Sequence, residues 1–318
     1  MTIDPELLPF IDALNQVWPE YPLSLDVQTW RDRAERLSSA AVKPTHEGLD
    51  SQDIEVASPH GPVTVRLYRP KSKGPLPALI YMHGGGWVIG SHRTHDAITA
   101  DIALQTLAVV ISVHYSRAPE AQYPVATEEC RTVVEWVFAN ADELGIDAAN
   151  IFVGGDSAGG NLATVMALMF RQDPARRLRG QVLVYPVVDT DFSRHSFIRE
   201  AQAPFLKAAE MVWFWGQYCP DPVRRLEPFA TPIRAPDFSG MPPALVMVAE
   251  HDPLCDEGAD YAARLRKAGI AVDFRPGTGL IHGYLRARGI SRAARAEFDA
   301  ICTWIRQQSL PIHHRSPP

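Results

Sequence analysis

The stretch Ile151-Phe152-Val153-Gly154-Gly155-Asp156-Ser157-Ala158-Gly159-Gly160-Asn161 decides the fold. It opens as a short apolar run and continues into residues 158–171, whose apolar periodicity is that of a helix. The Gly-x-Ser-x-Gly pattern therefore lies where a strand passes directly into a helix, a sharp turn that leaves no room for side chains at Gly155 and Gly159. This context predicts an exposed Ser157 beside the free N–H groups of the new helix. The alternative interpretation is a glycine-rich turn with a helix-capping serine.

Apolar runs and helix-like patterns alternate on both sides of this stretch. Short runs bounded by Gly, Pro or Asn are typical of strands buried on both faces, and intervening helices favour parallel pairing. A strand-like run at 52–57 and alternating polarity at 63–69 predict an antiparallel edge. The sequence therefore predicts the α/β class, with a mostly parallel central sheet flanked by helices. The expected buried strands are 78–82, 108–113, 151–154, 181–185, 244–249 and 271–274, and the expected helices around them are 94–105, 125–141, 158–171, 256–268 and 291–307.

Two parts of the chain stand outside this alternation. Residues 5–17 and 27–37 have the pattern of short amphipathic helices and precede any strand. Residues 187–241 are rich in Pro, Trp and Phe, include a predicted helix at 206–218, and are too long for a simple loop. We expect both parts to cover the sheet as a helical cap. The predicted division is N-terminal cap helices at 1–45, a first core segment at 46–186, a cap insertion at 187–241 and a second core segment at 242–318.

The composition is that of an ordinary folded chain. Of its 318 residues, 46% are hydrophobic and 21% are charged, far from the polar composition of disordered chains. Lys and Arg number 31 against 37 Asp and Glu, which gives a net charge of -6. Because no overall positive field exists to hold phosphate backbones, nucleic acid is excluded as an expected partner.

Three features bear on the location of the protein. Asp4, Pro5 and Glu6 stand where a secretory signal would have basic residues followed by an apolar run. The most apolar stretches, such as 78–82 and 107–113, are far shorter than the roughly 20 residues that span a bilayer. Four scattered cysteines without a Cys-x-x-Cys pair favour reduced thiols over disulfides or a zinc site. Together these features predict a cytoplasmic protein without a membrane span.

A serine hydroxyl becomes a good nucleophile only when a base takes its proton and an acid orients that base. Asp252 follows the predicted strand 244–249, at the edge where loops of a parallel sheet build sites. Asp256 and Glu257 are the alternative candidates for the acid. They precede an apolar helix, and this position suits residues that cap the start of that helix. His282, after the last strand, is the expected base. We prefer it to His251, which would share the loop of Asp252.

The motif His83-Gly84-Gly85-Gly86-Trp87 follows the predicted strand 78–82. Consecutive glycines let backbone N–H groups approach a substrate oxygen, so Gly85, Gly86 and Ala158 are the expected oxyanion donors. A structural alternative is a flexible turn with Trp87 as a core residue. A phosphate loop is excluded because no Lys follows Gly90.

Metal chemistry is not expected either. His92 and His95 could form a metal pair at helical spacing, but they lack supporting ligands, and a catalytic metal normally has three protein ligands. We therefore expect no metal and no cofactor.

Taken together, these motifs resemble the hormone-sensitive-lipase-like family (family IV) of α/β-hydrolase esterases, over essentially the whole chain. The resemblance implies the α/β-hydrolase fold with a helical cap, and it assigns Ser157, Asp252 and His282 the same roles of nucleophile, acid and base. It also implies hydrolysis of short- to medium-chain esters. Two departures are Tyr284, where Phe is frequent, and Cys255, where Arg is frequent; the latter predicts sensitivity to thiol reagents.

We therefore predict a serine carboxylesterase that forms an acyl-enzyme on a small-molecule ester. Its alternatives are an amidase, lactonase or acyltransferase that uses the same residues, and a non-catalytic small-molecule receptor. An exposed edge strand at 271–275 predicts a homodimer. The residues expected to bind substrate are Trp87, Phe205, Leu206, Met211, Trp213, Phe214 and Trp215.

Overall fold

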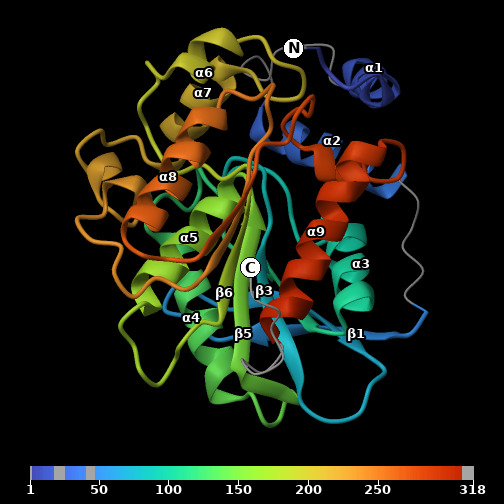
Figure 1. Ribbon diagram of the computed structural model, residues 1–318, viewed down its shortest axis with the longest axis vertical. Helices are drawn as coiled ribbons and strands as arrows, with labels where there is room; N and C mark the ends of the chain where they lie inside the picture. The colour runs from blue at the N-terminus through green and yellow to red at the C-terminus, as the bar shows by residue number, and fades with distance from the viewer. Residues whose placement is uncertain (1, 18–25, 41–46, 310–318) are drawn as a thin grey trace.

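A computed structural model describes residues 2–17, 26–40 and 47–309, and these contain one eight-stranded sheet (Figure 1). Its strand order is β1-β2-β4-β3-β5-β6-β7-β8, with antiparallel pairing for β1–β2 and β2–β4 and parallel pairing from β4 to β8. The predicted antiparallel edge and mostly parallel sheet are confirmed. The strands are β1 (Leu49–Val56), β2 (Val63–Pro70), β3 (Leu76–Met82), β4 (Val109–His114), β5 (Ile146–Asp156), β6 (Gly180–Val184), β7 (Ala244–Met247) and β8 (Val272–Arg275).

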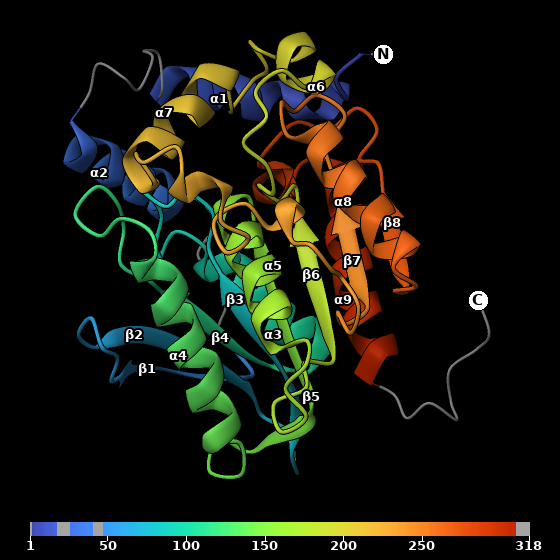
Figure 2. The same cartoon turned by 90° about the vertical axis from the view of Figure 1, so that its left-hand side faces the viewer.

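The central strands are buried on both faces. In β3, Ala78, Ile80 and Met82 pack into one hydrophobic cluster, whereas Leu79 and Tyr81 pack into the other. Helices α4, α5 and α8 cover the first face, and α3 and α9 cover the second (Figures 1 and 2). This double cover explains why the strands read as continuous apolar runs. The covering helices are α3 (Asp96–Thr106), α4 (Val125–Ala139), α5 (Ala158–Phe170), α8 (Cys255–Lys267) and α9 (Arg292–Ser309).

A second group of helices lies over the carboxyl ends of the parallel strands (Figure 2). It combines segments from the start and the middle of the chain: α1 (Leu8–Val17), α2 (Val27–Ala40), α6 (His195–Arg199) and α7 (Ala208–Tyr218). Trp30 of α2 packs against Trp213 and Phe214 of α7, with ring centroids 5.9 and 6.0 Å apart. Aromatic contact thus joins the two segments.

Buried hydrogen bonds tie α2 to the sheet-bearing part of the molecule. Arg31 donates from Nε to the carbonyl of Val88 and from Nη2 to the carbonyl of Ala118, both at 2.9 Å. It also forms two hydrogen bonds with the Glu120 carboxylate, at 2.7 and 2.8 Å. One side chain therefore holds α2 to two loops.

Several element boundaries differ from those expected from the sequence. β5 begins at Ile146, not at Ile151, and its pairing with β3 shifts register between Leu76 and Ala78. The polar stretch between these points hides the strand from an apolar pattern: there the Asp147 carboxylate accepts the N–H of Ala149 at 3.0 Å. Residues 187–241 hold α6 and two short 3-10 helices, Arg224–Leu226 and Pro232–Arg234, in addition to the expected helix.

Parts of the predicted segments 1–45 and 242–318 lie outside the described residues. Within the residues that are described, no helix combines the length and the apolar composition needed to cross a membrane.

Candidate active site

Ser157 stands at the turn between β5 and α5, where the sequence predicts a sharp passage from strand to helix. Its φ of 56° and ψ of -121° are unusual for a residue with a side chain. A Cβ on Gly155 would lie 2.4 Å from the Met82 carbonyl oxygen, and one on Gly159 only 2.0 Å from the same atom. Both positions therefore require glycine. The turn is held by the Ser157 N–H, which donates to the Val184 carbonyl at 2.9 Å.

The structure brings Ser157, His282 and Asp252 into one hydrogen-bonded series. His282 Nε2 lies 2.9 Å from Ser157 Oγ, and His282 Nδ1 lies 2.6 Å from Asp252 Oδ2. All three residues are buried, so the expected exposure of Ser157 is wrong: the serine is only 6% exposed, because the cavity it faces is enclosed. With the Nδ1 proton directed to the carboxylate, Nε2 is free to accept the serine proton, which is the arrangement required for an activated serine.

The loops that carry Asp252 and His282 are paired directly. Beyond the ends of β7 and β8, His251 and Ile281 form an isolated parallel bridge, and the His251 N–H donates to the Leu280 carbonyl at 2.9 Å. Asp252 Oδ1 accepts the N–H of Leu254 at 2.9 Å, which leaves Oδ2 for the histidine. The bridge therefore sets the approach of the acid to the base.

The competing acids and histidine have other partners. Asp256 accepts the N–H of Ser196 at 2.7 Å. Glu257 is buried and accepts the N–H of Val188 at 2.7 Å, while His251 Nδ1 lies 3.6 Å from Glu200. Each of these groups is used to hold a loop.

The glycine loop lies against Ser157 and has the backbone shape that glycines allow. Gly85 and Gly86 have φ values of 125° and 57°. A Cβ on Gly86 would lie 2.2 Å from the Phe214 ring. The N–H groups of Gly85, Gly86 and Ala158 have no acceptor among the described residues, so they are available to an oxygen beside Ser157.

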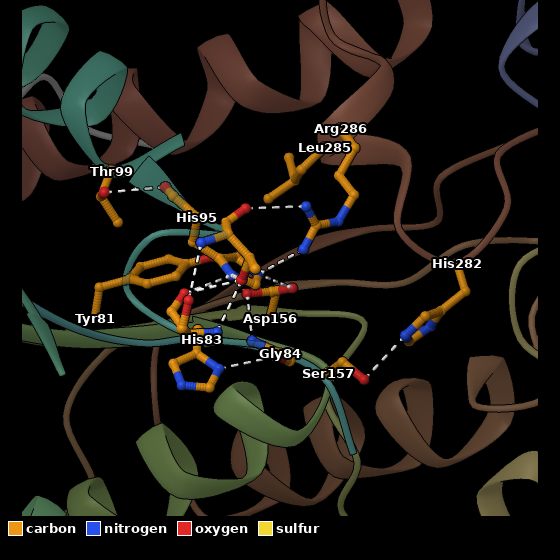
Figure 3. A network of polar contacts seen from close by, with 12 residues as sticks. Tyr81, His83, Gly84, His95, Thr99, Asp156, Ser157, His282, Leu285 and Arg286 are labelled. Atoms are coloured by element: carbon orange, nitrogen blue, oxygen red, sulfur yellow. Dashed lines mark hydrogen bonds and ion pairs between the residues drawn. The ribbon is translucent and has the colours of Figure 1, made fainter. Parts of the chain in front are cut away.

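Asp156, which precedes Ser157, joins the glycine loop to the serine turn (Figure 3). Its Oδ1 accepts the Tyr81 hydroxyl at 2.7 Å and the Gly84 N–H at 3.0 Å. Its Oδ2 lies 3.3 Å from His95 Nε2, which also lies 3.1 Å from Arg286 Nη2. Burial raises the pKa of the Asp156 carboxyl, but His95, Arg286 and Tyr81 outweigh burial and hold that pKa below its usual range. The carboxylate is therefore charged. No motif in the sequence marked Asp156 as a site residue.

A cavity of about 720 Å³ opens onto Ser157 and His282. Its lining includes four of the seven residues expected to bind substrate: Phe205, Leu206, Met211 and Phe214. The Phe205 ring lies over His282, with ring centroids 6.0 Å apart.

The other three expected residues do not line this cavity. Trp87 is fully buried, and its ring stacks on Tyr218 with centroids 4.2 Å apart. Trp215 is also fully buried and contacts Trp87, while Trp213 packs against Trp30. Successive residues of α7 point about 100° apart, so only one side of this aromatic run faces the cavity.

Comparison with known proteins places this geometry in a family. A family model described as alpha/beta hydrolase fold matches residues 79–286. The chain belongs to the α/β-hydrolase family. An ethyl acetate hydrolase from Pseudomonas putida is 34% identical over 307 residues, which cover 92% of this chain and 95% of the relative. Esterase LipI from Mycobacterium tuberculosis is 36% identical over 299 residues, with coverage of 92% and 91%.

Solved structures are similar over nearly the same length. A hyperthermophilic esterase from the archaeon Pyrobaculum calidifontis matches this α/β-hydrolase with a TM-score of 0.90 and 38% identity, covering 97% of this chain and 99% of that one. A thermostable esterase from Pseudomonas putida matches with a TM-score of 0.91 and 32% identity, covering 98% of each chain. The predicted α/β-hydrolase fold and the resemblance to hormone-sensitive-lipase-like esterases are confirmed.

The cavity of this α/β-hydrolase also uses residues that the sequence analysis did not select. Phe10, Leu14 and Trp30 reach it from α1 and α2, and Glu210 and Arg286 add ionisable groups. The amphipathic pattern of the first helices was the only signal for their apolar members. Nothing in the local pattern distinguished Glu210 from a surface glutamate of α7.

The remaining histidines and the neighbouring cysteine are placed as follows. His92 and His95 are both buried, and the described residues contain no group of three or more potential ligands arranged for a metal ion. Burial raises the pKa of the Cys255 thiol to about 12, and Asp252 and Asp256 add to this effect through their charge. A protonated thiol is a weak nucleophile, and this argues against the predicted sensitivity to thiol reagents.

Proposed function

We propose that this α/β-hydrolase is a serine carboxylesterase that hydrolyses short- to medium-chain carboxylic esters through an acyl-enzyme. The relatives confirm the predicted class of enzyme. The observation that carries the mechanism is the series from Ser157 Oγ to His282 to Asp252, facing a cavity beside three available N–H groups.

In the acylation step, Ser157 Oγ attacks the ester carbonyl carbon while its proton passes to His282 Nε2. The carbonyl oxygen becomes an oxyanion that accepts hydrogen bonds from the N–H groups of Gly85, Gly86 and Ala158. Collapse of this intermediate breaks the bond to the alcohol oxygen, which takes the proton from His282. The acyl group is then esterified to Ser157, and the alcohol leaves.

In deacylation, water attacks the acyl carbon and gives a proton to His282 Nε2. Collapse of the second intermediate releases the acid and returns this proton to Ser157 Oγ. During both steps Asp252 holds the imidazole in the required tautomer and stabilises the transient imidazolium. The ester and water are the two reactants, and Ser157 and His282 return to their starting states at the end of the cycle.

Substrate selection is assigned to the cap, which we take to be residues 1–45 and 187–241 over the core segments 46–186 and 242–318. Phe205, Leu206, Met211 and Phe214 supply apolar surface beside the reacting groups. A cavity of about 720 Å³ suits a small ester with a short to medium acyl chain.

The test is hydrolysis of p-nitrophenyl acetate, butyrate, octanoate and palmitate by the wild type and by Ser157→Ala. Loss of a serine nucleophile can lower turnover roughly a million-fold. We expect cleavage of the shorter esters by the wild type alone. Equal activity of both proteins would rule out Ser157 as the nucleophile, and a folded but inactive wild type would redirect the search to amides, lactones or ligand binding.

A homodimer through the β8 edge is a separate proposal. Ala244 and Val248 of the β7 side donate to the carbonyls of Ala271 and Arg275, so the Val272 N–H faces away from β7. The Val272 carbonyl on this edge accepts Arg266 Nη2 at 3.1 Å, and an edge strand with outward N–H groups still favours addition of another strand. Light scattering should show a wild-type dimer and a folded Val272→Pro monomer; a wild-type monomer, or an equally tight variant dimer, would contradict the proposal.

A cytoplasmic location is also proposed. Cys130, Cys219, Cys255 and Cys302 all occur as free thiols, the state typical of a reducing compartment.

A further inference from the structure

A carboxyl group lies in the otherwise largely apolar substrate cavity. Glu210, in the first turn of α7, lines this cavity together with Ser157 and His282. The residue is only 6% exposed, and the apolar cavity residues Met211 and Phe214 follow it on the helix. Burial of a carboxyl group in such surroundings is unfavourable unless its oxygens are hydrogen-bonded.

One oxygen of Glu210 has a structural role. Oε2 accepts the Lys207 N–H at 2.6 Å and thereby caps the start of α7. Oε1 has no hydrogen-bond partner among the described residues. The other cavity-lining carboxylate differs, since Asp156 already accepts Tyr81 and Gly84 through Oδ1 and faces His95 through Oδ2. Capping therefore explains only half of the Glu210 carboxyl group.

The charges around the cavity indicate which donor would suit Oε1. Burial raises the pKa of Glu210 above its usual value. The hydrogen bond from the Lys207 N–H and the charges of Lys207 and His282 lower this pKa, but burial outweighs them. Lys207 and Arg286 also line the cavity, and both would repel a cationic substrate group. A hydroxyl group adds no charge. It donates to Oε1 of a carboxylate, and because a hydroxyl oxygen also accepts, it can pair with Oε1–H of a protonated carboxyl group.

We propose that Glu210 is a specificity-determining residue whose Oε1 accepts a hydrogen bond from a hydroxyl group on the acyl or the alcohol part of the ester. The enzyme would then favour hydroxylated esters over their unsubstituted analogues, because a bound analogue shields Oε1 from water and offers it no donor. This inference rests on the proposed esterase function.

The experiment compares kcat/KM for ethyl butyrate, ethyl 3-hydroxybutyrate and 2-hydroxyethyl butyrate, measured as acid released in a pH-stat. The second ester carries the hydroxyl on the acyl part and the third on the alcohol part. For each hydroxylated ester, its kcat/KM is divided by the kcat/KM of ethyl butyrate. This ratio is measured in the wild type, Glu210→Gln and Glu210→Met. We expect at least one ratio to fall roughly tenfold to hundredfold in Glu210→Met. It should fall less in Glu210→Gln, whose amide oxygen caps Lys207 while its NH2 group can donate to the substrate hydroxyl.

Glu6→Met is the matched control. Glu6 accepts the N–H of Arg292 at 2.7 Å, at the start of α9, and does not line the cavity. Its loss should lower the thermal unfolding temperature without changing either ratio. The same behaviour in both Glu210 variants, lower stability with both ratios unchanged, would show that Glu210 is only a capping residue and would overturn the inference.

Failure of the proposed function gives a different result. In that case the folded wild type hydrolyses none of the three esters. If Glu210→Met does not fold, the ratios of Glu210→Gln decide: a smaller ratio than in the wild type supports the inference, and an unchanged ratio for both hydroxyl positions overturns it.

Discussion

Asp156 Oδ1 accepts the backbone N–H of Gly84 at 3.0 Å. This bond ties the residue before Ser157 to the first glycine of the loop that carries the proposed oxyanion donors. A Cβ on Gly84 would lie 2.4 Å from Asp156 Oδ2, so the carboxylate lies tightly against the loop (Figure 3). The serine turn and the glycine loop are thus positioned as one unit.

Asp156→Ala should therefore lower kcat by about tenfold to hundredfold with a smaller change in KM, because the donors shift while the cavity persists. Steady-state kinetics on p-nitrophenyl butyrate checks this. Tyr81→Phe is the control, since it removes the other bond to Oδ1 and leaves the Gly84 bond in place. An unchanged kcat in folded Asp156→Ala would mean that the loop is held by other contacts.

Gly86→Ala should abolish most activity. The new Cβ would lie 2.2 Å from the Phe214 ring, and the backbone φ of 57° is strained for alanine. Displacement of one oxyanion donor costs about a hundredfold to a thousandfold in kcat. Gly216→Ala lies on the same helix as Phe214 but has open space around the added Cβ, so it should keep wild-type activity. Equal activity of the two variants would argue against a role for the Gly86 N–H.

Arg31→Met should lower the free energy of unfolding by about 2–4 kcal/mol, because it leaves the buried carbonyls of Val88 and Ala118 without their donor. Glu120→Gln should cost less than about 1 kcal/mol, since the Glu120 side chain is 63% exposed. Urea unfolding of both variants measures the difference. Similar losses in the two variants would show that the ion pair, and not the carbonyl contacts, holds α2.

The buried Glu257 should make the stability of the enzyme depend on pH. Burial raises the pKa of Glu257 well above its ordinary value of 4.5, although the Val188 and Asp189 N–H groups oppose this effect. The unfolded chain ionises first, so wild-type stability is lost as pH rises from 4.5 toward the folded pKa.

Glu257→Gln keeps an oxygen for both N–H groups but does not ionise. Its free energy of unfolding, relative to the wild type, should therefore be higher at pH 8 than at pH 4 by more than about 1 kcal/mol. Urea unfolding at both pH values gives the comparison, and other titrating groups cancel between the two proteins. A pH-independent difference would contradict the assigned burial effect.

Much of the fold could be read from local patterns. Each apolar run predicted a strand, because a strand buried on both faces needs apolar side chains at successive positions. The start of β5 was missed because its first residues are polar and interrupt the ladder. Helix α6, which has only five residues, also lacked a periodic signal.

The sequence predicts Ser157, Asp252 and His282 as neighbours, and the structure joins them by hydrogen bonds, while their catalytic roles stay a prediction. Strand ends of a parallel sheet meet at one edge, and this rule places the three loops near one another. The choice among Asp252, Asp256 and Glu257 depended on a capping argument. The structure gives Asp256 and Glu257 other partners, namely the N–H groups of Ser196 and Val188.

What the sequence determined by itself was the local geometry: the glycine-lined turn at Ser157, the glycine loop, and the order of strands and helices. Steric limits and side-chain periodicity act between residues that are close in sequence, so the sequence alone predicts their effects. Only the tertiary structure decided which side chains face the cavity. Trp213 and Phe214 are adjacent in sequence, but α7 packs on α2 and on the glycine loop so that Phe214 lines the cavity and Trp213 does not. The direction of a helix face depends on contacts between distant segments, which no local pattern encodes.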